Sequence, residues 1–109
     1  MFTILYYSDN VQQMILKLPV GLLARYTKLA KRIEVYGPNL GMPHTRALGG
    51  GLFEIRAKSN EGIARVFYCC MVGRRVVMLH SFVKKTMDTP KHEMEIAERR
   101  HDDVKKNWR

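Results

Sequence analysis

Apolar residues in the first third of this chain recur with a helical period. Between positions 11 and 33 they return every three or four residues, and Pro19 divides them into two stripes. The pattern predicts two consecutive helices packed as an antiparallel hairpin, with a helix cap at Ser8 and a stop at Gly37. The first stripe holds Val11, Met14, Ile15 and Leu18, and the second holds Leu22, Leu23, Tyr26, Leu29, Ala30 and Ile33.

From residue 52 onward the period changes to two, which is typical of half-exposed strands. Turn residues at 59–62 and around Gly73 then separate two further strands, at 63–71 and 75–83, and the three strands predict an antiparallel meander. In the first strand, the apolar side holds Phe53, Ile55 and Ala57, and the charged side holds Glu54, Arg56 and Lys58.

Two more extended segments lie upstream of the meander. Residues 2–7 are short, β-branched and aromatic, which predicts a strand at the start of the chain. The loop over residues 39–51 is rich in glycine and proline, and a short extended piece is expected within it at 45–48.

The last segment predicts a helix that runs to the C-terminus. Thr89 is a good N-cap residue, and Pro90 suits the first helical position. The apolar residues of this segment form a loose stripe, and its cations are expected to point outward. The stripe holds Met94, Ala97, Val104 and Trp108, and the cations are Arg99, Arg100, Lys105 and Lys106.

The charge of the chain is strongly one-sided. Its 109 residues suit one ordinary domain, residues 1–109, and 19 Lys and Arg against 10 Asp and Glu give a net charge of +9. Such a charge indicates a nucleic acid, an anionic membrane or an acidic protein as partner. A membrane is the weakest of these, because no apolar run is long enough to span one and no early stretch resembles a signal peptide. We therefore expect a cytoplasmic protein.

The second predicted helix carries a cationic face whose role the pattern leaves open. Its cations are either solvated or in direct contact with nucleic acid. They are Arg25, Lys28, Lys31 and Arg32.

Chemistry that needs a metal or a cofactor has little support. Cys69 and Cys70 are neighbours on one predicted strand, so they point to opposite faces and a disulfide between them would be strained. No Cys and His pair has metal-ligand spacing, and His44, His92 and His101 are expected to be surface residues. We expect no metal and no cofactor.

Four ordered blocks of the sequence resemble the RelE/ParE superfamily of toxins. The most specific block joins a phenylalanine, a double lysine and a threonine to a helix led by proline. The resemblance covers residues 2–104 and is closest to the HigB-like, phage-derived branch. The blocks are residues 52–56 (LFEIR), 64–68 (ARVFY) and 77–86 (VMLHSFVKKT), then Thr89 and Pro90 with Glu93, Ala97 and Arg100.

The resemblance implies an α+β fold in which a helical hairpin packs on a curved antiparallel sheet with a C-terminal helix. It also implies the toxin of a type II toxin–antitoxin system, silenced by an antitoxin encoded alongside, which we expect to be acidic and of the helix-turn-helix kind. Most such toxins cleave messenger RNA on the ribosome, so a metal-independent endoribonuclease, or mRNA interferase, is the expected activity. Two alternatives stay open: a ParE-like inhibitor of DNA gyrase, and a non-catalytic basic regulator that binds nucleic acid.

Cleavage of RNA requires loss of the 2′-hydroxyl proton, stabilisation of the phosphorane and neutralisation of the leaving oxygen. By the resemblance, Arg56 and Arg65 are expected to hold the scissile phosphate, although cross-strand salt bridges would also account for them. Lys85 is the expected acid, base or charge stabiliser. His80 either moves a proton or packs within the sheet. The chain lacks the C-terminal Asp, Tyr and His cluster of acid–base-rich HigB relatives, which favours catalysis by cations.

Further residues are expected to bind RNA. Lys84 and Lys85 alternate across the strand end, so only one of them faces the same side as the two arginines. Tyr68 is a candidate for stacking on a base, although aromatic residues also suit strands for packing reasons alone. The complete set is Lys84, Tyr68, Lys58 and Arg46.

Overall fold

The N-terminal third of the chain forms a strand and two helices, as its hydrophobic pattern predicts. The computed structural model describes residues 1–84 and 89–109. Ser8 caps the first helix, because its hydroxyl oxygen accepts a hydrogen bond from the Val11 N–H at 3.2 Å. The elements are strand β1 (Thr3–Tyr6), helix α1 (Asp9–Leu16) and helix α2 (Val20–Tyr36).

The four strands that follow form a meander, in which the last three are the predicted strands and the first is the short extended piece expected at 45–48. With β1 they make a five-stranded sheet in the described part of the chain, in the order β1-β5-β4-β3-β2. Neighbouring strands are antiparallel except that β1 runs parallel to β5, with Thr3 opposite Arg75. The strands are β2 (Thr45–Gly49), β3 (Leu52–Ser59), β4 (Gly62–Met71) and β5 (Arg75–Lys84).

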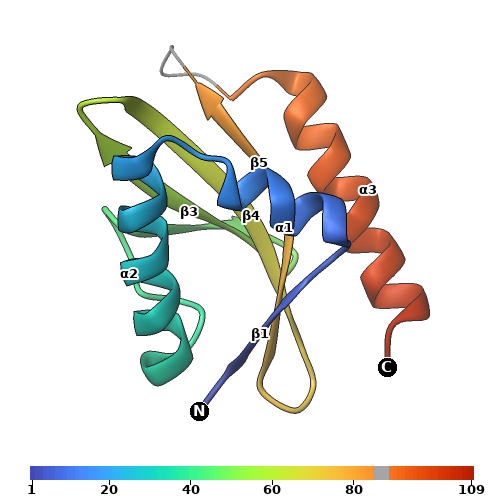
Figure 1. Ribbon diagram of the computed structural model, residues 1–109. Coiled ribbons are helices and arrows are strands. Elements are labelled where there is room, and N and C mark those ends of the chain that lie inside the picture. The colour runs from blue at the N-terminus through green and yellow to red at the C-terminus, as the bar shows by residue number, and fades with distance from the viewer. Residues whose placement is uncertain (85–88) are drawn as a thin grey trace.

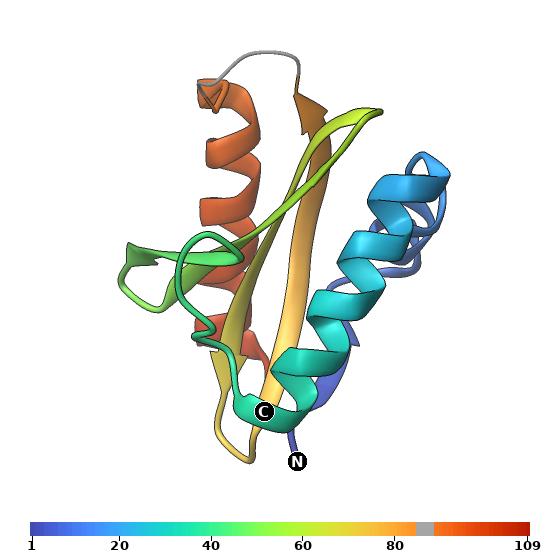
Figure 2. The same ribbon diagram turned by 90° about the vertical axis from the view of Figure 1, so that its left-hand side faces the viewer.

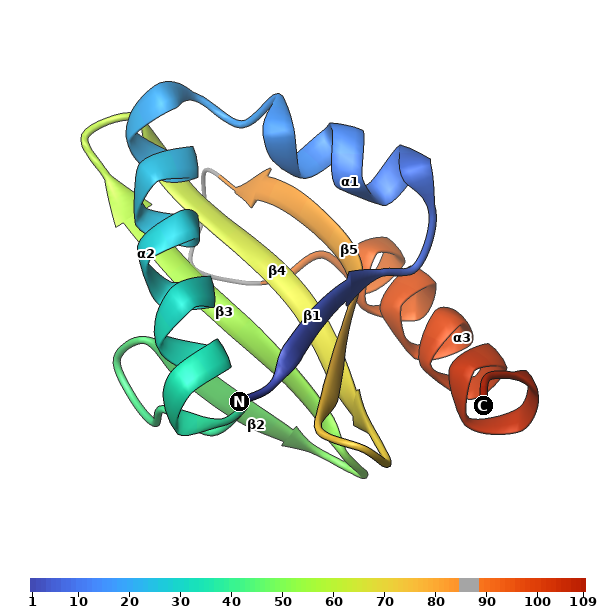
Figure 3. The same cartoon turned by 60° about the horizontal axis from the view of Figure 1, so that its bottom comes forward.

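Helices α1 and α2 pack on one face of this sheet, α1 over β5 and α2 over β3 (Figures 1 and 3). They follow each other directly, as a helical hairpin requires, but α2 turns across the sheet instead of running back along α1 (Figure 3). Val11 and Ile15 of α1 and Leu22 and Leu29 of α2 enter one apolar cluster with the sheet. Each helix therefore buries its apolar stripe against the strands.

Helix α3 (Lys91–Asn107) lies against the opposite face, so the sheet is covered on both sides (Figure 2). It begins one residue later than its sequence predicts. Pro90 is the N-cap in place of Thr89, because its ψ of 137° is not helical while its carbonyl oxygen already accepts from the Glu93 N–H at 3.1 Å. The confirmed α+β fold thus has three layers.

The middle strands are apolar on both faces, because both faces are covered. Val66 of β4 enters the cluster under α1 and α2, whereas the next residue, Phe67, enters the cluster under α3. The predicted stripe of α3 is confirmed by Ala97 and Val104, which are buried in the second cluster. Arg100 departs from its predicted outward position, because it donates a hydrogen bond to the Leu79 carbonyl oxygen at 2.7 Å.

A candidate phosphate-binding site on the sheet

The register of β3 and β4 places two arginines directly opposite each other. Arg56 of β3 pairs with Arg65 of β4, and directly opposed residues share one face of a sheet. The face is the one that carries α3, because Phe67, two residues after Arg65, packs under that helix. Two like charges in this position repel each other unless an anion lies between them. The pair therefore favours a bound anion.

Arg65 lies almost wholly inside the protein beside a single carboxylate. Its side chain is 5% exposed, that of Glu54 is 4% exposed, and the Arg65 Nε lies 3.7 Å from the Glu54 Oε1. In the part of the chain that the structure describes, neither the Arg65 Nε nor the Glu54 Oε2 has a hydrogen-bond partner. Burial lowers the pKa of Arg65, Glu54 opposes this effect, and Arg56 and Arg46 add to it. The charge of the guanidinium is therefore compensated by Glu54 through a long contact that makes no hydrogen bond.

Arg56 is half-buried and is held by the loop before β2. Its backbone N–H donates to the His44 carbonyl oxygen at 2.8 Å, and its Nη1 lies 3.2 Å from the Met42 Sδ. A sulfur atom is a weak acceptor, so this contact orients the guanidinium without using its hydrogen-bonding capacity. Arg56 can therefore offer paired donors to an anion.

A hollow of about 370 Å³ opens where these two arginines meet. Lys58 follows Arg56 along the same face of β3 and is exposed in this hollow. Arg46 is exposed on β2, directly opposite Glu54. The structure thus brings four of the predicted residues to one surface. The hollow is lined by Arg25, Pro43, His44, Arg56, Lys58, Ile63 and Arg65.

Only the first lysine of the double lysine that ends β5 is among the described residues. Lys84 is 5% exposed and pairs across the sheet with Ile63, which lines the hollow. Its position next to the hollow agrees with a role there. Lys85 lies outside the described residues, so its predicted role stays a prediction.

His80 is packed between the sheet and α3, apart from the residues that line the hollow. It is 4% exposed, its ring is stacked with those of Phe67 and Phe82, and its Nε2 lies 3.1 Å from the Glu93 Oε1. Burial lowers the pKa of His80, and its hydrogen bond to the Glu93 carboxylate opposes this effect. Of the two roles that the sequence left open, this geometry corresponds to the packed histidine.

Tyr68 lies on the opposite face of the sheet. Its ring is fully buried and stacked on Phe53 at 5.4 Å between ring centroids, and its hydroxyl donates to the Pro38 carbonyl oxygen. Burial raises the pKa of Tyr68. In this position the ring joins the core under α1 and α2, and no face of it is open to a base.

Sequence reasoning did not assign Glu54 or His44 to this surface, and it left open whether Arg25 contacts nucleic acid. Glu54 could have been found, because it lies two residues from Arg56 on a strand with a clear period of two. His44 could not have been found, and Arg25 could not have been placed beside Arg56 and Arg65, since they reach the hollow from a loop and from α2. Their proximity depends on packing between elements that are far apart in sequence.

Other kinds of site find little support in the described residues. Within residues 1–84 and 89–109, no group of three or more His, Cys, Asp or Glu side chains is placed to hold a metal ion. Cys69 is buried, Cys70 is exposed, and both are free thiols. None of the helices in the described part has the length and apolar character that crossing a bilayer requires.

Comparison with known proteins gives one match to a family model. The model describes phage-derived protein Gp49-like (DUF891) and matches residues 13–102. This range contains α2, the meander and most of α3, and with them every residue that lines the hollow. No curated protein matches the chain.

Proposed function

We propose that this chain, which belongs to the family of phage-derived Gp49-like proteins, is the toxin of a toxin–antitoxin pair and cleaves messenger RNA on the ribosome. The family is associated with toxin–antitoxin modules, which supports the first part of the proposal. The second part rests mainly on one observation: Arg56 and Arg65 face each other in a basic hollow. Two guanidinium groups on directly opposed residues of neighbouring strands suit a phosphodiester whose negative charge increases in the transition state.

The proposed reaction needs no metal ion. The 2′-oxygen of one nucleotide bonds to the adjacent phosphorus while the bond from phosphorus to the 5′-oxygen breaks, which leaves a 2′,3′-cyclic phosphate and a 5′-hydroxyl. Arg56 and Arg65 donate hydrogen bonds to the non-bridging oxygens and stabilise the phosphorane. A base must take the 2′-hydroxyl proton, and an acid must deliver one to the leaving oxygen. Lys85 is our candidate for one of these two transfers.

Glu54 acts in this proposal as a positioning residue for Arg65. A buried guanidinium needs a compensating charge, and Glu54 supplies it through one contact at 3.7 Å. Arg65 also lines the hollow, so its guanidinium can donate to a phosphate there while Glu54 lies beside its buried Nε. The arginine is thus charged and oriented before the RNA binds.

The net charge supports the choice of partners. A chain with a charge of +9 is attracted to the ribosome and to messenger RNA, both of which are polyanions. The same charge favours an acidic antitoxin, whose flexible segment can cover the basic surface. Co-purification with the protein encoded in the adjacent reading frame tests this partner.

Primer extension on messages from cells that express the protein tests the cleavage. We expect new 5′ ends within translated codons in the wild type. Arg56→Ala removes one stabilising donor of a half-exposed residue and is expected to slow cleavage roughly 100-fold. Arg99→Ala, which removes a charge from the exposed side of α3, serves as the matched control and should leave the 5′ ends unchanged.

Arg65 requires a gentler substitution. Arg65→Ala leaves Glu54 buried without a countercharge, which costs about 3–5 kcal/mol and risks unfolding. Arg65→Lys keeps the charge but loses the paired donors, so a folded Arg65→Lys protein with slow cleavage would support the site. Full toxicity and unchanged 5′ ends in both the Arg56 and the Arg65 variants would reject it. Inhibition of gyrase supercoiling without RNA cleavage would reject the proposed activity.

A further inference from the structure

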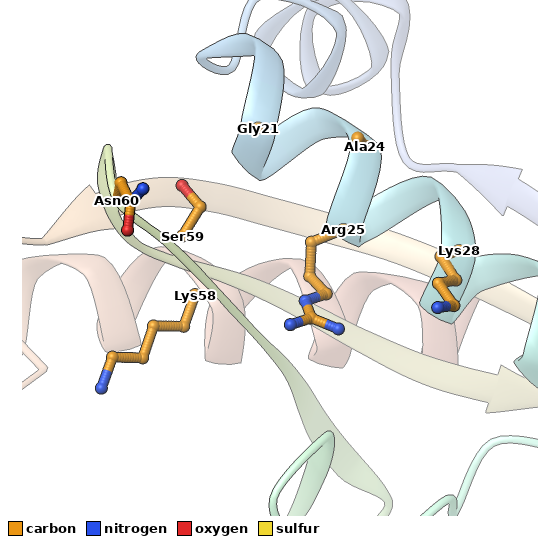
Figure 4. Close-up of a pocket in the computed structure, with 7 residues that line it drawn as sticks. All are labelled: Gly21, Ala24, Arg25, Lys28, Lys58, Ser59 and Asn60. Carbon is orange, nitrogen blue, oxygen red and sulfur yellow. The ribbon is translucent and has the colours of Figure 1, made fainter.

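The hollow at Arg56 and Arg65 continues into a second one along β3. The second hollow has a volume of about 420 Å³ and shares Arg25 and Lys58 with the first. We call the two together the α2–β3 groove. The second hollow is lined by Gly21, Ala24, Arg25, Lys28, Lys58, Ser59 and Asn60 (Figure 4).

The groove follows an edge of β3 that β2 leaves open. The pairing of β2 with β3 extends only from Leu52 to Ile55, and the Arg56 N–H donates to a loop residue, His44. Beyond Arg56, the described strands offer β3 no partner on this side, and the cationic face of α2 lies beside it instead (Figure 4). The end of β3 is therefore one wall of the groove, and α2 is the other.

The width of the groove is set by a contact between the two walls. Glu61, in the turn after β3, accepts a hydrogen bond from the Gly21 N–H in the first turn of α2. A Cβ atom at Gly21 would lie 2.5 Å from this carboxylate oxygen, so a larger residue there would displace the Glu61 side chain from this contact. Ser59 steadies the turn, because its Oγ accepts from the Glu61 N–H at 3.0 Å. The groove is thus formed before any ligand arrives.

The charges in the groove are arranged in a row. Figure 4 shows Arg25 and Lys28 projecting from α2 and Lys58 projecting from β3, with their charged ends spread apart instead of converging. Continuing along the groove, Arg56 and Arg65 add two more cations. No carboxylate is among the described residues that line either hollow. A row of separated cations suits a chain of anions better than one small anion.

We infer that the α2–β3 groove binds the sugar–phosphate backbone of single-stranded RNA next to the phosphate held by Arg56 and Arg65. The inference rests on the proposed function and adds a second stretch of substrate contacts, with Lys28 as its outer cation and Arg25 shared with the first hollow. An acidic peptide fits less well, because docked peptides rely on apolar anchors and the second hollow is lined by small and charged residues. A backbone of phosphates needs only cations and hydrogen-bond donors.

The test measures binding to labelled single-stranded RNA that carries 2′-O-methyl groups and so cannot be cut. Fluorescence anisotropy with a trimer and a dodecamer, over a series of NaCl concentrations, compares the wild type with Arg56→Ala and with two double variants. Arg25→Ala with Lys28→Ala removes the two groove cations that α2 contributes. Arg99→Ala with Lys106→Ala removes the same charge from exposed positions of α3 and is the matched control.

We expect the groove variant to bind the dodecamer more weakly and to lower the slope of log K against log salt by about 1.4, since each phosphate contact on a single strand contributes about 0.7. Trimer binding should weaken less than dodecamer binding, because Lys28 lines only the second hollow whereas Arg25 also lines the first, and the control variant should change little. An unchanged dodecamer slope in the groove variant, together with weaker binding by Arg56→Ala, would overturn the groove and leave the cleavage site standing. Unchanged RNA binding in the groove variant and in Arg56→Ala would overturn both the groove and the cleavage site. Weaker binding of polyglutamate, with unchanged RNA binding, would assign the groove to an acidic protein.

Discussion

At the scale of single residues, the candidate site is distinguished by the buried ion pair of Arg65 and Glu54. A buried ion pair contributes little to net stability, because the loss of hydration offsets the attraction between the charges. This pair makes one contact at 3.7 Å and leaves one polar atom on each partner without a hydrogen bond in the described part. Such an arrangement suits a site that must receive a ligand better than one that only holds the fold.

His80 and His101 are buried histidines whose titration should affect stability, and burial lowers the pKa of His101 although its sequence predicts a surface position. Burial also holds the folded-state pKa of His80 below the ordinary value near 6.5, and its hydrogen bond to Glu93 opposes that effect while Arg100 and His92 add to it. The unfolded chain therefore takes up a proton more readily than the folded one. The stability that neutral His80 contributes is complete above about pH 6.5 and is lost as the pH falls through the folded value.

We therefore expect the free energy of unfolding to fall between pH 7 and pH 5. His80→Gln keeps a donor for Glu93 but does not titrate, so the decrease should be smaller, by up to about 1.4 kcal/mol for each pH unit over which the folded histidine stays neutral. Urea unfolding followed by circular dichroism measures both proteins. His44→Gln, at a half-buried loop position, is the control. Equal pH dependence in the wild type and in His80→Gln would contradict the prediction.

At the scale of elements, the hydrogen bond between α2 and the turn after β3 affects both the stability of the helix and the shape of the groove. Helix α2 follows Pro19, which provides no side-chain cap, and Glu61 supplies the missing acceptor from a distant turn. A carboxylate at a helix N-terminus stabilises the helix through a hydrogen bond and through the helix dipole. One contact therefore both caps the helix and fixes the distance between α2 and β3.

Removing this cap should cost measurable stability. Glu61→Ala is expected to lower the free energy of unfolding by about 0.5–2 kcal/mol, the usual range for loss of an N-cap. Glu61→Gln keeps an acceptor oxygen and loses only the charge, so it should cost about 0.3–1 kcal/mol. Urea unfolding at neutral pH ranks the three proteins. The role of Glu61 as a cap is refuted if the alanine variant is as stable as the wild type.

At the scale of the whole molecule, the sheet lies between two apolar cores and contributes side chains to each. One core lies under α1 and α2 and the other under α3, and the middle strands contribute to both. The segments near the two chain ends also meet, since Tyr7 is stacked on Trp108 and donates a hydrogen bond to Asp103 at 2.7 Å. This arrangement leaves the end of β3 and the basic hollow uncovered by any described helix core.

The net charge of +9 should make stability depend on salt. Repulsion among the cations opposes the compact state, and salt screens it, with a Debye length that falls to about 10 Å at 0.1 M. We expect the melting temperature to rise between low and moderate NaCl concentrations, with about 1 kcal/mol corresponding to about 4 °C in a domain of this size. Differential scanning calorimetry measures the change.

Arg99→Gln with Lys106→Gln lowers the net charge at exposed positions of α3 and provides the comparison. This variant should have a higher melting temperature at low salt and a smaller rise with NaCl. A melting temperature that falls as salt is added would mean that attraction between charges, such as the pair of Lys105 and Asp102 at 3.4 Å, outweighs repulsion.

The sequence by itself determined the elements and the face on which each side chain lies. Helical and strand periods depend only on residue spacing, so both helices of the first third, the meander and the face shared by Glu54 and Arg56 could be read directly. The resemblance of the sequence to the RelE/ParE toxins also indicated Arg56 and Arg65 as phosphate ligands, and the structure places these two residues opposite each other.

Only the tertiary structure decided which elements meet. Four features join parts of the chain that no sequence pattern relates to each other. They are the parallel pairing of β1 with β5, the burial of Glu54 beside Arg65, the contact of His80 with Glu93 and the groove between α2 and β3. The physical reason is that such contacts depend on the packing of whole faces. A periodic pattern predicts that a face is buried, and not what will cover it.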